Sequence, residues 1–261
     1  VKNVVSYLKP RASYGIVGND STNGARFLYL PGAWQFYQGS MTVNPQDRGT
    51  NFGTNGNWLQ AVKELTAGNP NVTWETATKI NVGLDAGFFK DQLHAYVDFF
   101  WEDRKDILVS NAATLSAVTS LPSGYVNEGR VKNHGFEVTL NWEQKIGDFR
   151  YSISPNFAFA RNKVIEMLEV KPMYDYLSRT GLPVGQRFGY DLFEFYQPGT
   201  EERYKEVYGT EMPDQNIDLK YGDAVYVDLN GDGIVDQNDQ KPLGYTDNPE
   251  ITYSVNFNFQ W

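Results

Sequence analysis

The chain has 261 residues, a formal net charge of −9 and an aromatic content of 15%. This charge argues against a nucleic-acid-binding protein, which would carry the opposite balance with clustered lysine and arginine. Cysteine is absent and no stretch approaches 18 consecutive apolar residues, which excludes a disulfide framework, a cysteine-based metal or redox site and a membrane-spanning helix.

Apolar and polar residues alternate with a period of two in several segments, the pattern of β-strands with one apolar face. In chain order the predicted strands cover about residues 8–16, 80–88, 93–101, 135–142, 149–159 and 251–261. The last is the clearest, because the alternation runs unbroken from Ile251 to Trp261. Such a run matches the 9–11 residues that a tilted strand needs to cross a bilayer.

The connections between these strands alternate between long and short. Long ones cover about 17–76, 105–130 and 163–249, and short ones lie near Lys90 and Gly147. Every short connection falls at the same end, as in outer-membrane barrels with short periplasmic turns and long extracellular loops. The prediction is an all-β fold, part of a transmembrane antiparallel β-barrel, with 163–249 as a long extracellular loop region.

The same parity predicts the surroundings of single residues. The segments 90–92 and 145–148 should be periplasmic, while Asn44, Ser116 and Asp232 should lie outside the cell. The apolar side of each strand should face outer-membrane lipid, through Ile80, Val82, Leu84, Val97, Phe99, Val138, Leu140, Val255 and Phe257. A globular β-sandwich could share the pattern by accident.

The six predicted strands are too few to close a barrel, because about eight is the smallest closed transmembrane barrel. Unpaired backbone groups cost several kcal/mol each in lipid. The chain also begins at Val1 without a signal peptide. The missing signal peptide suggests a mature form or an internal fragment of an exported protein. The strand count favours a fragment, whose edge strands would pair with strands outside residues 1–261.

Several segments resemble, in order, the SusC/RagA-like TonB-linked outer-membrane transporters. They are residues 8–15 (LKPRASYG), 69–85, 125–137, 181–190 and 222–233. The resemblance implies a 22-stranded barrel that imports glycans or peptides, an N-terminal plug that engages the TonB complex, and a SusD-like surface lipoprotein as partner. The plug is not in this sequence. In the family further strands follow the one that matches 251–261; alternatively, Trp261 is a terminal aromatic that signals barrel assembly.

One segment has the spacing of a twelve-residue calcium loop. Oxygen-bearing side chains stand at positions 1, 3, 5, 9 and 12, with a backbone carbonyl at 7 and Gly233 at 6; the predicted ligands are Asp228, Asn230, Asp232, Ile234, Asp236 and Asp239. Asp replaces the usual Glu at position 12, and flanking helices are not evident. The alternative is a turn rich in Asx and Gly that satisfies its own backbone and binds nothing.

The sequence offers no anchor for covalent catalysis. The two histidines, His94 and His134, form no zinc motif, and neither a nucleophile elbow nor a phosphate loop occurs. Two suitably spaced carboxylates could serve a glycosidase, although a solvated rim is the simpler interpretation; the candidates are Asp98, Glu102, Asp103 and Asp106. We predict no catalytic residues and no enzyme activity.

Aromatic residues in the long connections are candidates for binding substrate or a partner, or else for packing the loops themselves. The set is Trp34, Phe36, Tyr37, Trp58, Tyr174, Tyr176, Phe193, Phe195 and Tyr196. Within it the selected candidates are Trp34, Tyr37, Trp58, Tyr174 and Tyr196. The runner-up interpretation of the whole chain is a secreted calcium-dependent carbohydrate-binding β-sandwich or a glycosidase module.

Overall fold

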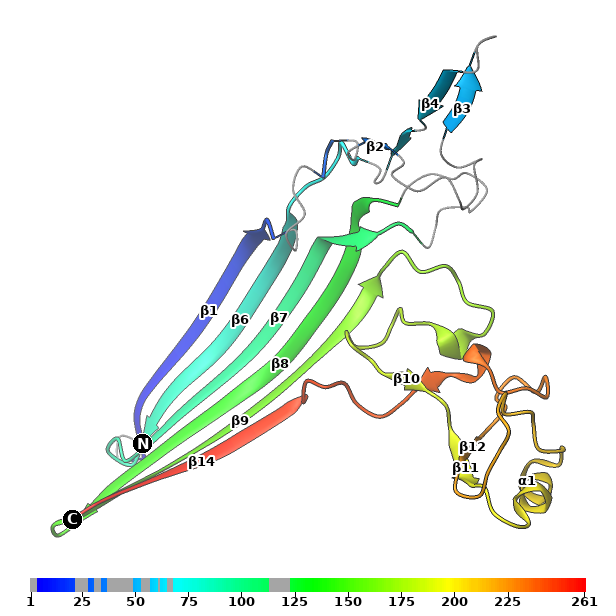
Figure 1. Cartoon of the computed structure of the whole chain (residues 1–261). Coiled ribbons are helices and arrows are strands. Elements are labelled where there is room, and N and C mark those ends of the chain that lie inside the picture. Colours follow the sequence, from blue (N-terminus) through cyan, green and yellow to red (C-terminus); the bar gives the residue numbers. More distant parts are fainter. Residues whose placement is uncertain are drawn as a thin grey trace.

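The computed structural model describes residues 4–21, 28–30, 34–36, 49–52, 57–60, 62–64, 68–112 and 123–261. Its main element is one six-stranded antiparallel sheet (Figure 1). The strands lie in the sheet in the same order as in the chain: β1 (Val5–Asn19), β6 (Glu75–Phe88), β7 (Leu93–Ser110), β8 (Tyr125–Ile146), β9 (Phe149–Glu166) and β14 (Ile251–Gln260). All six predicted strands are therefore confirmed.

Most of the strands are longer than the sequence indicated. β7 and β9 have 18 residues each and β8 has 22. Most of the extra residues lie at the end that carries the long connections, where charged residues such as Asp103 and Arg104 interrupt the alternation. Register shifts near Arg104 and Ile107 mark the same region of β7. Alternation is required only where one face contacts lipid, so the strands continue beyond the segment in which the pattern can be recognised.

Short and long connections lie at opposite ends of the sheet (Figure 1). β6 and β7 are joined by residues 89–92, and β8 and β9 by the two-residue turn Gly147–Asp148. The long connections cover 20–74, 111–124 and 167–250, so the last of them begins four residues later than the predicted 163. Asn44 and Ser116 lie outside the described residues.

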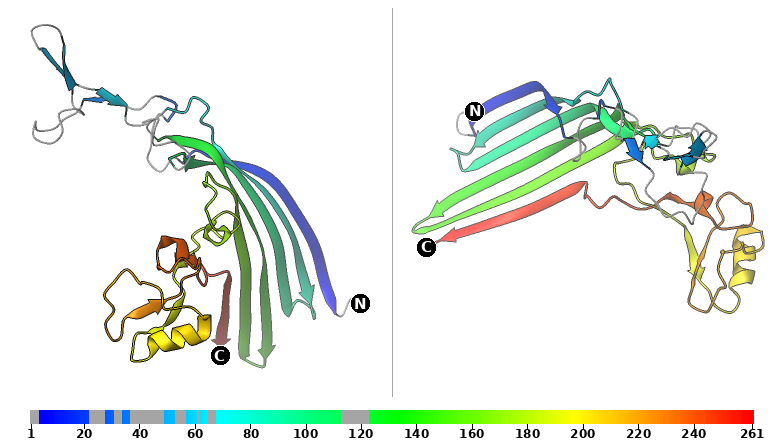
Figure 2. Two further views of the ribbon diagram at one scale, coloured as in Figure 1. Left: turned by 90° about the vertical axis from the view of Figure 1, so that its right-hand side faces the viewer. Right: turned by 45° about the horizontal axis from the view of Figure 1, so that its top comes forward.

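Cross-strand pairing places the predicted lipid-facing residues on one face. Val82 pairs with Phe99, Leu84 with Val97, and Val97 with Val138. Among the nine predicted residues, Ile80, Val82, Leu84, Phe99, Val255 and Phe257 are exposed, and Val97, Val138 and Leu140 are half-buried. The apolar face carries no second layer among the described residues, and the sheet is curved (Figure 2).

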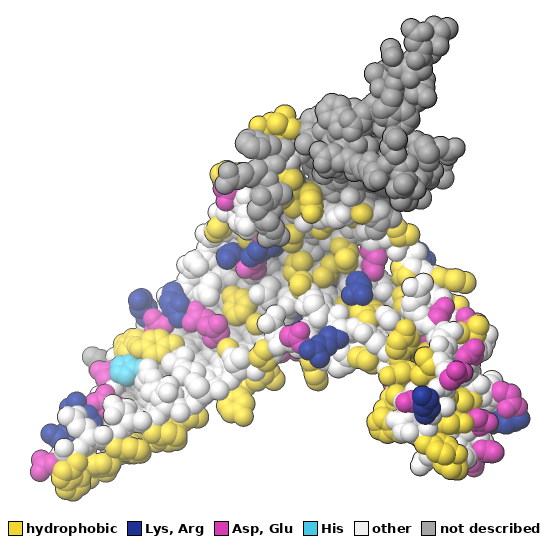
Figure 3. Space-filling view, in the orientation of Figure 1, with side chains coloured by type: hydrophobic (Ala, Val, Ile, Leu, Met, Phe, Trp, Pro, Cys, Tyr) yellow, Lys and Arg dark blue, Asp and Glu magenta, His cyan; other side chains and the backbone are white. Residues whose placement is uncertain are grey.

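The opposite face is polar. Charged and other polar side chains cover much of the sheet surface that Figure 3 turns toward the reader, while apolar side chains gather along its lower margin. This division is that of a barrel wall with a polar interior and an apolar exterior.

The connection 167–250 folds on itself. It contains the strand pairs β10 (Phe188–Gly189) with β13 (Lys241–Pro242) and β11 (Leu192–Phe195) with β12 (Ala224–Tyr226). It also holds helix α1 (Thr200–Tyr208) and 3₁₀ turns over Asp175–Leu177 and Gln237–Asp239. Its buried residues include Thr200, Tyr204, Gln215, Val225, Val227, Val235 and Asp239.

The first long connection contains two short strand pairs: β2 (Trp34–Phe36) with β5 (Val62–Glu64), and β3 (Gly49–Phe52) with β4 (Asn57–Gln60). Among the described residues, no helix is long and apolar enough to cross a membrane.

Candidate functional site in the polar face and the long connections

An arginine on the polar face joins three neighbouring strands. Arg11 of β1 lies opposite Gly83 of β6, which lies opposite Asp98 of β7. Its Nε atom donates to Asp85 Oδ1 at 2.7 Å, and its Nη2 atom donates to Asp98 Oδ2 at 2.5 Å. We call these contacts the Arg11 bridge.

Gly83 makes the Arg11 bridge possible. A Cβ atom at this position would lie 2.6 Å from Asp98 Oδ1 and 2.9 Å from Arg11 Cζ. The guanidinium group of Arg11 therefore crosses β6 over Gly83, which has no side chain to block it. The bridge neutralises part of the negative charge on the polar face.

A second charged cluster lies closer to the long connections. Arg104 contacts Glu75 and Glu102 at 2.8 Å each, and Lys79 lies 3.5 Å from Glu102. Arg11 and Arg104 thus each bond acidic side chains from both β6 and β7. Both clusters cross strand pairs and so stabilise the wall of the sheet.

The four carboxylates considered for glycosidase chemistry do not form a catalytic pair. Asp98 and Glu102 belong to the two clusters above, Asp103 receives two hydrogen bonds from Arg130, and Asp106 accepts one from Thr76. Asp103 also lies opposite Thr78 while Glu102 lies opposite Lys79, so adjacent acids point to opposite faces of the sheet. Their partners are structural.

The acidic loop of residues 228–239 uses its carboxylates on its own backbone. Asp228 accepts hydrogen bonds from the N–H groups of Gly231 (2.6 Å) and Gly233 (2.8 Å). Asp239 is fully buried and accepts from the N–H groups of Leu229, Asn230 and Asp236 at 2.8–3.2 Å. These contacts close the loop through its own backbone.

The other predicted ligands follow the same pattern. Asn230 accepts from the N–H of Asp232, Asp232 accepts from the N–H of Ile234, and Asp236 caps the 3₁₀ turn that follows it. In the described part of the chain, no three Asp, Glu or His side chains are grouped so that they could hold a metal ion. The loop as it stands matches the self-satisfied turn, and calcium binding stays a prediction.

The selected tyrosines of the last long connection belong to two separate stacked pairs. Tyr174 stacks on Tyr176 with ring centroids 5.3 Å apart, and Tyr196 stacks on Tyr221 at 5.9 Å. The hydroxyl of Tyr176 donates to the Asn238 carbonyl at 2.7 Å, which ties the first pair to the acidic loop. Burial and nearby carboxylates raise the pKa of Tyr176, so it remains a donor at neutral pH.

The remaining aromatic candidates have other surroundings. Phe193 packs against Tyr204 and Tyr208 in the core of the connection, so its role is structural. Phe195 is 60% exposed. The backbone of Trp34 lies in β2 and that of Trp58 in β4, but their side chains, like all of Tyr37, are outside the described part.

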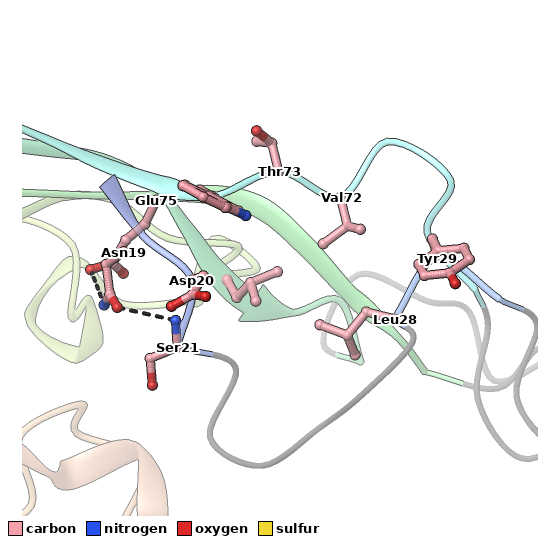
Figure 4. A pocket seen from close by; sticks show the side chains of 10 residues that line it. Asn19, Asp20, Ser21, Leu28, Tyr29, Val72, Thr73 and Glu75 are labelled. Carbon is pink, nitrogen blue, oxygen red and sulfur yellow. Dashed lines mark hydrogen bonds between the residues drawn. The ribbon is translucent and has the colours of Figure 1, made fainter. Parts of the chain in front are cut away.

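A cavity of about 210 Å³ lies where β1, β6 and β7 reach the long connections (Figure 4). Asn19 donates to Glu75 at 3.0 Å and accepts from the backbone of Ser21 at 3.0 Å, which fixes its polar side. The lining residues are Asn19, Asp20, Ser21, Leu28, Tyr29, Val72, Thr73, Trp74, Glu75 and Leu108. Sequence reasoning missed this cavity because its walls come from distant segments that share no periodic signal.

Comparison with known proteins places this geometry in a family. The family described as "TonB dependent receptor-like, beta-barrel" matches residues 5–261. The TonB-dependent receptor P3 of Formosa agariphila is 24% identical over 98% of this chain and 24% of that protein. The TonB-dependent receptor SusC of Bacteroides thetaiotaomicron is 27% identical over 93% of this chain and 23% of that protein. The chain thus spans about a quarter of the length of these relatives.

Solved structures show the same fold. The RagAB peptide transporter superposes with a TM-score of 0.66 and 20% identity, over 99% of this chain and 26% of that chain. Its "open-open" state gives a TM-score of 0.66 with 19% identity. A separate β-sandwich or glycosidase module does not fit these matches. The chain belongs to the TonB-dependent receptor-like β-barrel family and is part of an outer-membrane protein.

Proposed function

We propose that this chain is part of the wall and extracellular surface of an outer-membrane importer of glycans or peptides. Import is driven by the TonB complex, acting through a region outside this sequence, and it requires a SusD-like surface lipoprotein. The observation that carries the proposal is the division of the curved sheet into an apolar face and a polar, ion-paired face. The likeness to the RagAB peptide transporter supports peptides as cargo, and the sequence resemblance described above adds glycans.

The polar face is suited to line a passage. Its charges are paired across strands, so the wall remains rigid and does not collapse onto a passing solute. Binding and gated passage are the chemistry that these side chains can perform.

We propose that the stacked tyrosines of the last long connection contact cargo or the lipoprotein. Tyr221 is 76% exposed and stacks on Tyr196, so the pair offers a flat apolar surface with hydroxyl groups at its edge. Tyr174 offers a second such surface beside the acidic loop. Trp34, Tyr37 and Trp58 remain candidates in the first long connection.

Import is tested with the complete transporter gene in its native host. A deletion strain complemented with wild type should take up labelled oligosaccharide or labelled oligopeptide, and uptake should stop when TonB is removed. Tyr196→Ala should lower uptake, whereas Tyr245→Ala, at a residue that is 82% exposed and has no ring partner among the described residues, should not. Normal uptake of both cargo classes by the deletion strain would refute the importer.

The orientation is tested by cysteine labelling of intact cells with a membrane-impermeant reagent. Asp232→Cys, in the exposed part of the acidic loop, should be labelled, and Lys145→Cys, beside the short turn, should not. The reverse pattern would invert the topology.

A further inference from the structure

The apolar face ends in a defined row toward the long connections. Tyr14, Ile80, Trp101, His134 and Arg161 are cross-strand partners in consecutive strands, so their side chains share this face. Tyr14 is 69% exposed and Trp101 47%. Aromatic residues at such a border mark the boundary between lipid tails and headgroups. The next row outward therefore lies at headgroup level, about 7 Å farther along the strands.

That next row contains two lysines and one acid, Asp103 of β7, which lies directly opposite Lys132. Lys132 of β8 lies directly opposite Lys163 of β9, and both are exposed. The neighbouring acid, Asp103, is held by two hydrogen bonds from Arg130 at 2.9 and 2.7 Å. Among the described residues no carboxylate is within ion-pair distance of either lysine. Like charges directly opposite one another destabilise a strand pair, and an anion between them would remove that penalty.

The other border of the apolar face has no such charges. At the short-turn end the same face carries Trp142 and Phe149, and Phe149 packs against Phe259 and Trp261. The described strand residues on this face between that border and the Trp101 row are all uncharged. The two borders therefore differ in chemistry as the two leaflets of the membrane would require.

We propose that Lys132 and Lys163 form a binding site for the phosphate of an outer-leaflet lipid headgroup. The lysines supply the charge, and the aromatic side chains of the adjacent row receive the acyl chains. Arg161 borders the site and is committed to other contacts: it bonds Glu250 at 2.6 and 2.8 Å, and its guanidinium lies 5.5 Å from the ring centroid of Phe159. The proposal rests on the placement of the sheet in the membrane and not on the cargo.

The test uses the complete transporter in nanodiscs that contain either lipid A with its phosphate or lipid A from which phosphate has been removed. Bound lipid is counted by native mass spectrometry after detergent transfer. The double variant Lys132→Gln/Lys163→Gln should lower affinity for the phosphorylated lipid about 25-fold, since each basic side chain at a charged surface contributes about fivefold. The matched control Lys90→Gln/Lys145→Gln removes the same charge at the short-turn end and should bind as wild type does.

A second variant separates binding from folding. Lys132→Arg/Lys163→Arg keeps both charges and should retain the phosphorylated lipid, and all variants should show the heat-modifiable gel mobility of an assembled barrel. Equal retention of phosphorylated and phosphate-free lipid by wild type, or unchanged retention by the Gln double variant, would overturn the site. Loss of a co-purifying protein without loss of lipid would likewise overturn it, because the surface would then bind a protein.

Discussion

An arginine at the middle of the sheet should destabilise the barrel if it lies on the apolar face, but not if it lies on the polar face. Val138 of β8 lies midway between Trp142 and His134, which belong to the two borders. Eight residues of strand cover about 26 Å, or about 20 Å along the membrane normal at the usual strand tilt, so Val138 lies about 10 Å from either border. Its partners across the sheet are Val97 and Phe157. Val138→Arg should therefore cost about 2–4 kcal/mol, the value for arginine near the midplane.

The neighbouring residue provides the control. Thr139 faces the polar side and pairs with Tyr96 and Asn156. Glu137, two residues earlier on β8, lies on the same face. Thr139→Arg should change stability by less than about 1 kcal/mol, because the new charge meets water and a carboxylate. Urea unfolding of the complete transporter in lipid vesicles measures both variants. Equal costs for the two substitutions would refute the assignment of the faces.

Three further outcomes follow from contacts in the structure. Gly83→Ala should destabilise the sheet by about 1–3 kcal/mol by displacing the Arg11 bridge, whereas Gly15→Ala, which meets nothing within 4 Å, should be neutral in the same unfolding assay. Burial would raise the pKa of Glu169, but four hydrogen bonds to its carboxylate lower it overall. The stabilisation by the Glu169 carboxylate should thus be present above about pH 4.3 and be lost as the pH falls through its lower folded pKa. The loss should appear as faster hydrogen exchange of the Arg179 and Thr180 amides, which bond the carboxylate. Glu169→Gln should abolish this pH dependence. If the acidic loop binds calcium, titration calorimetry should give an affinity of about 10⁻⁴–10⁻³ M that Asp232→Ala weakens, and equal heats in the two proteins would exclude the site.

The sheet could be predicted from the sequence because its signal is local. Each run such as Ile251 to Trp261 records its own environment residue by residue, and the tight turn at Gly147 identifies a hairpin without knowledge of distant residues. The parts of β7 and β8 next to the long connections could not be predicted, because a strand with solvent on both faces needs no alternation of apolar and polar residues. The start of the last long connection was misplaced by four residues for the same reason.

The interior of that connection was hidden for a different reason. Phe188 pairs with Pro242 across more than fifty residues of chain, and a two-residue strand has no period to detect. Helix α1 begins and ends at glycines in left-handed conformation and its side chains provide no N-cap bond, so it lacked the usual start signal. In the acidic loop, the same Asp and Gly spacing serves an ion or the loop's own N–H groups, and composition alone cannot separate them.

The match between strand order and chain order has a consequence for how such surfaces diversify. Every neighbouring pair in the sheet is also consecutive among the long strands, so no connection has to cross another to complete the wall. The free-energy cost of closing a connection, which is entropic, rises only logarithmically with its length, by about 0.6 kcal/mol for each doubling. A lineage can therefore lengthen, shorten or exchange the segment between β9 and β14 while every strand keeps its partner. The membrane wall and the outer surface can change at independent rates, and new specificity can arise without redesign of the barrel.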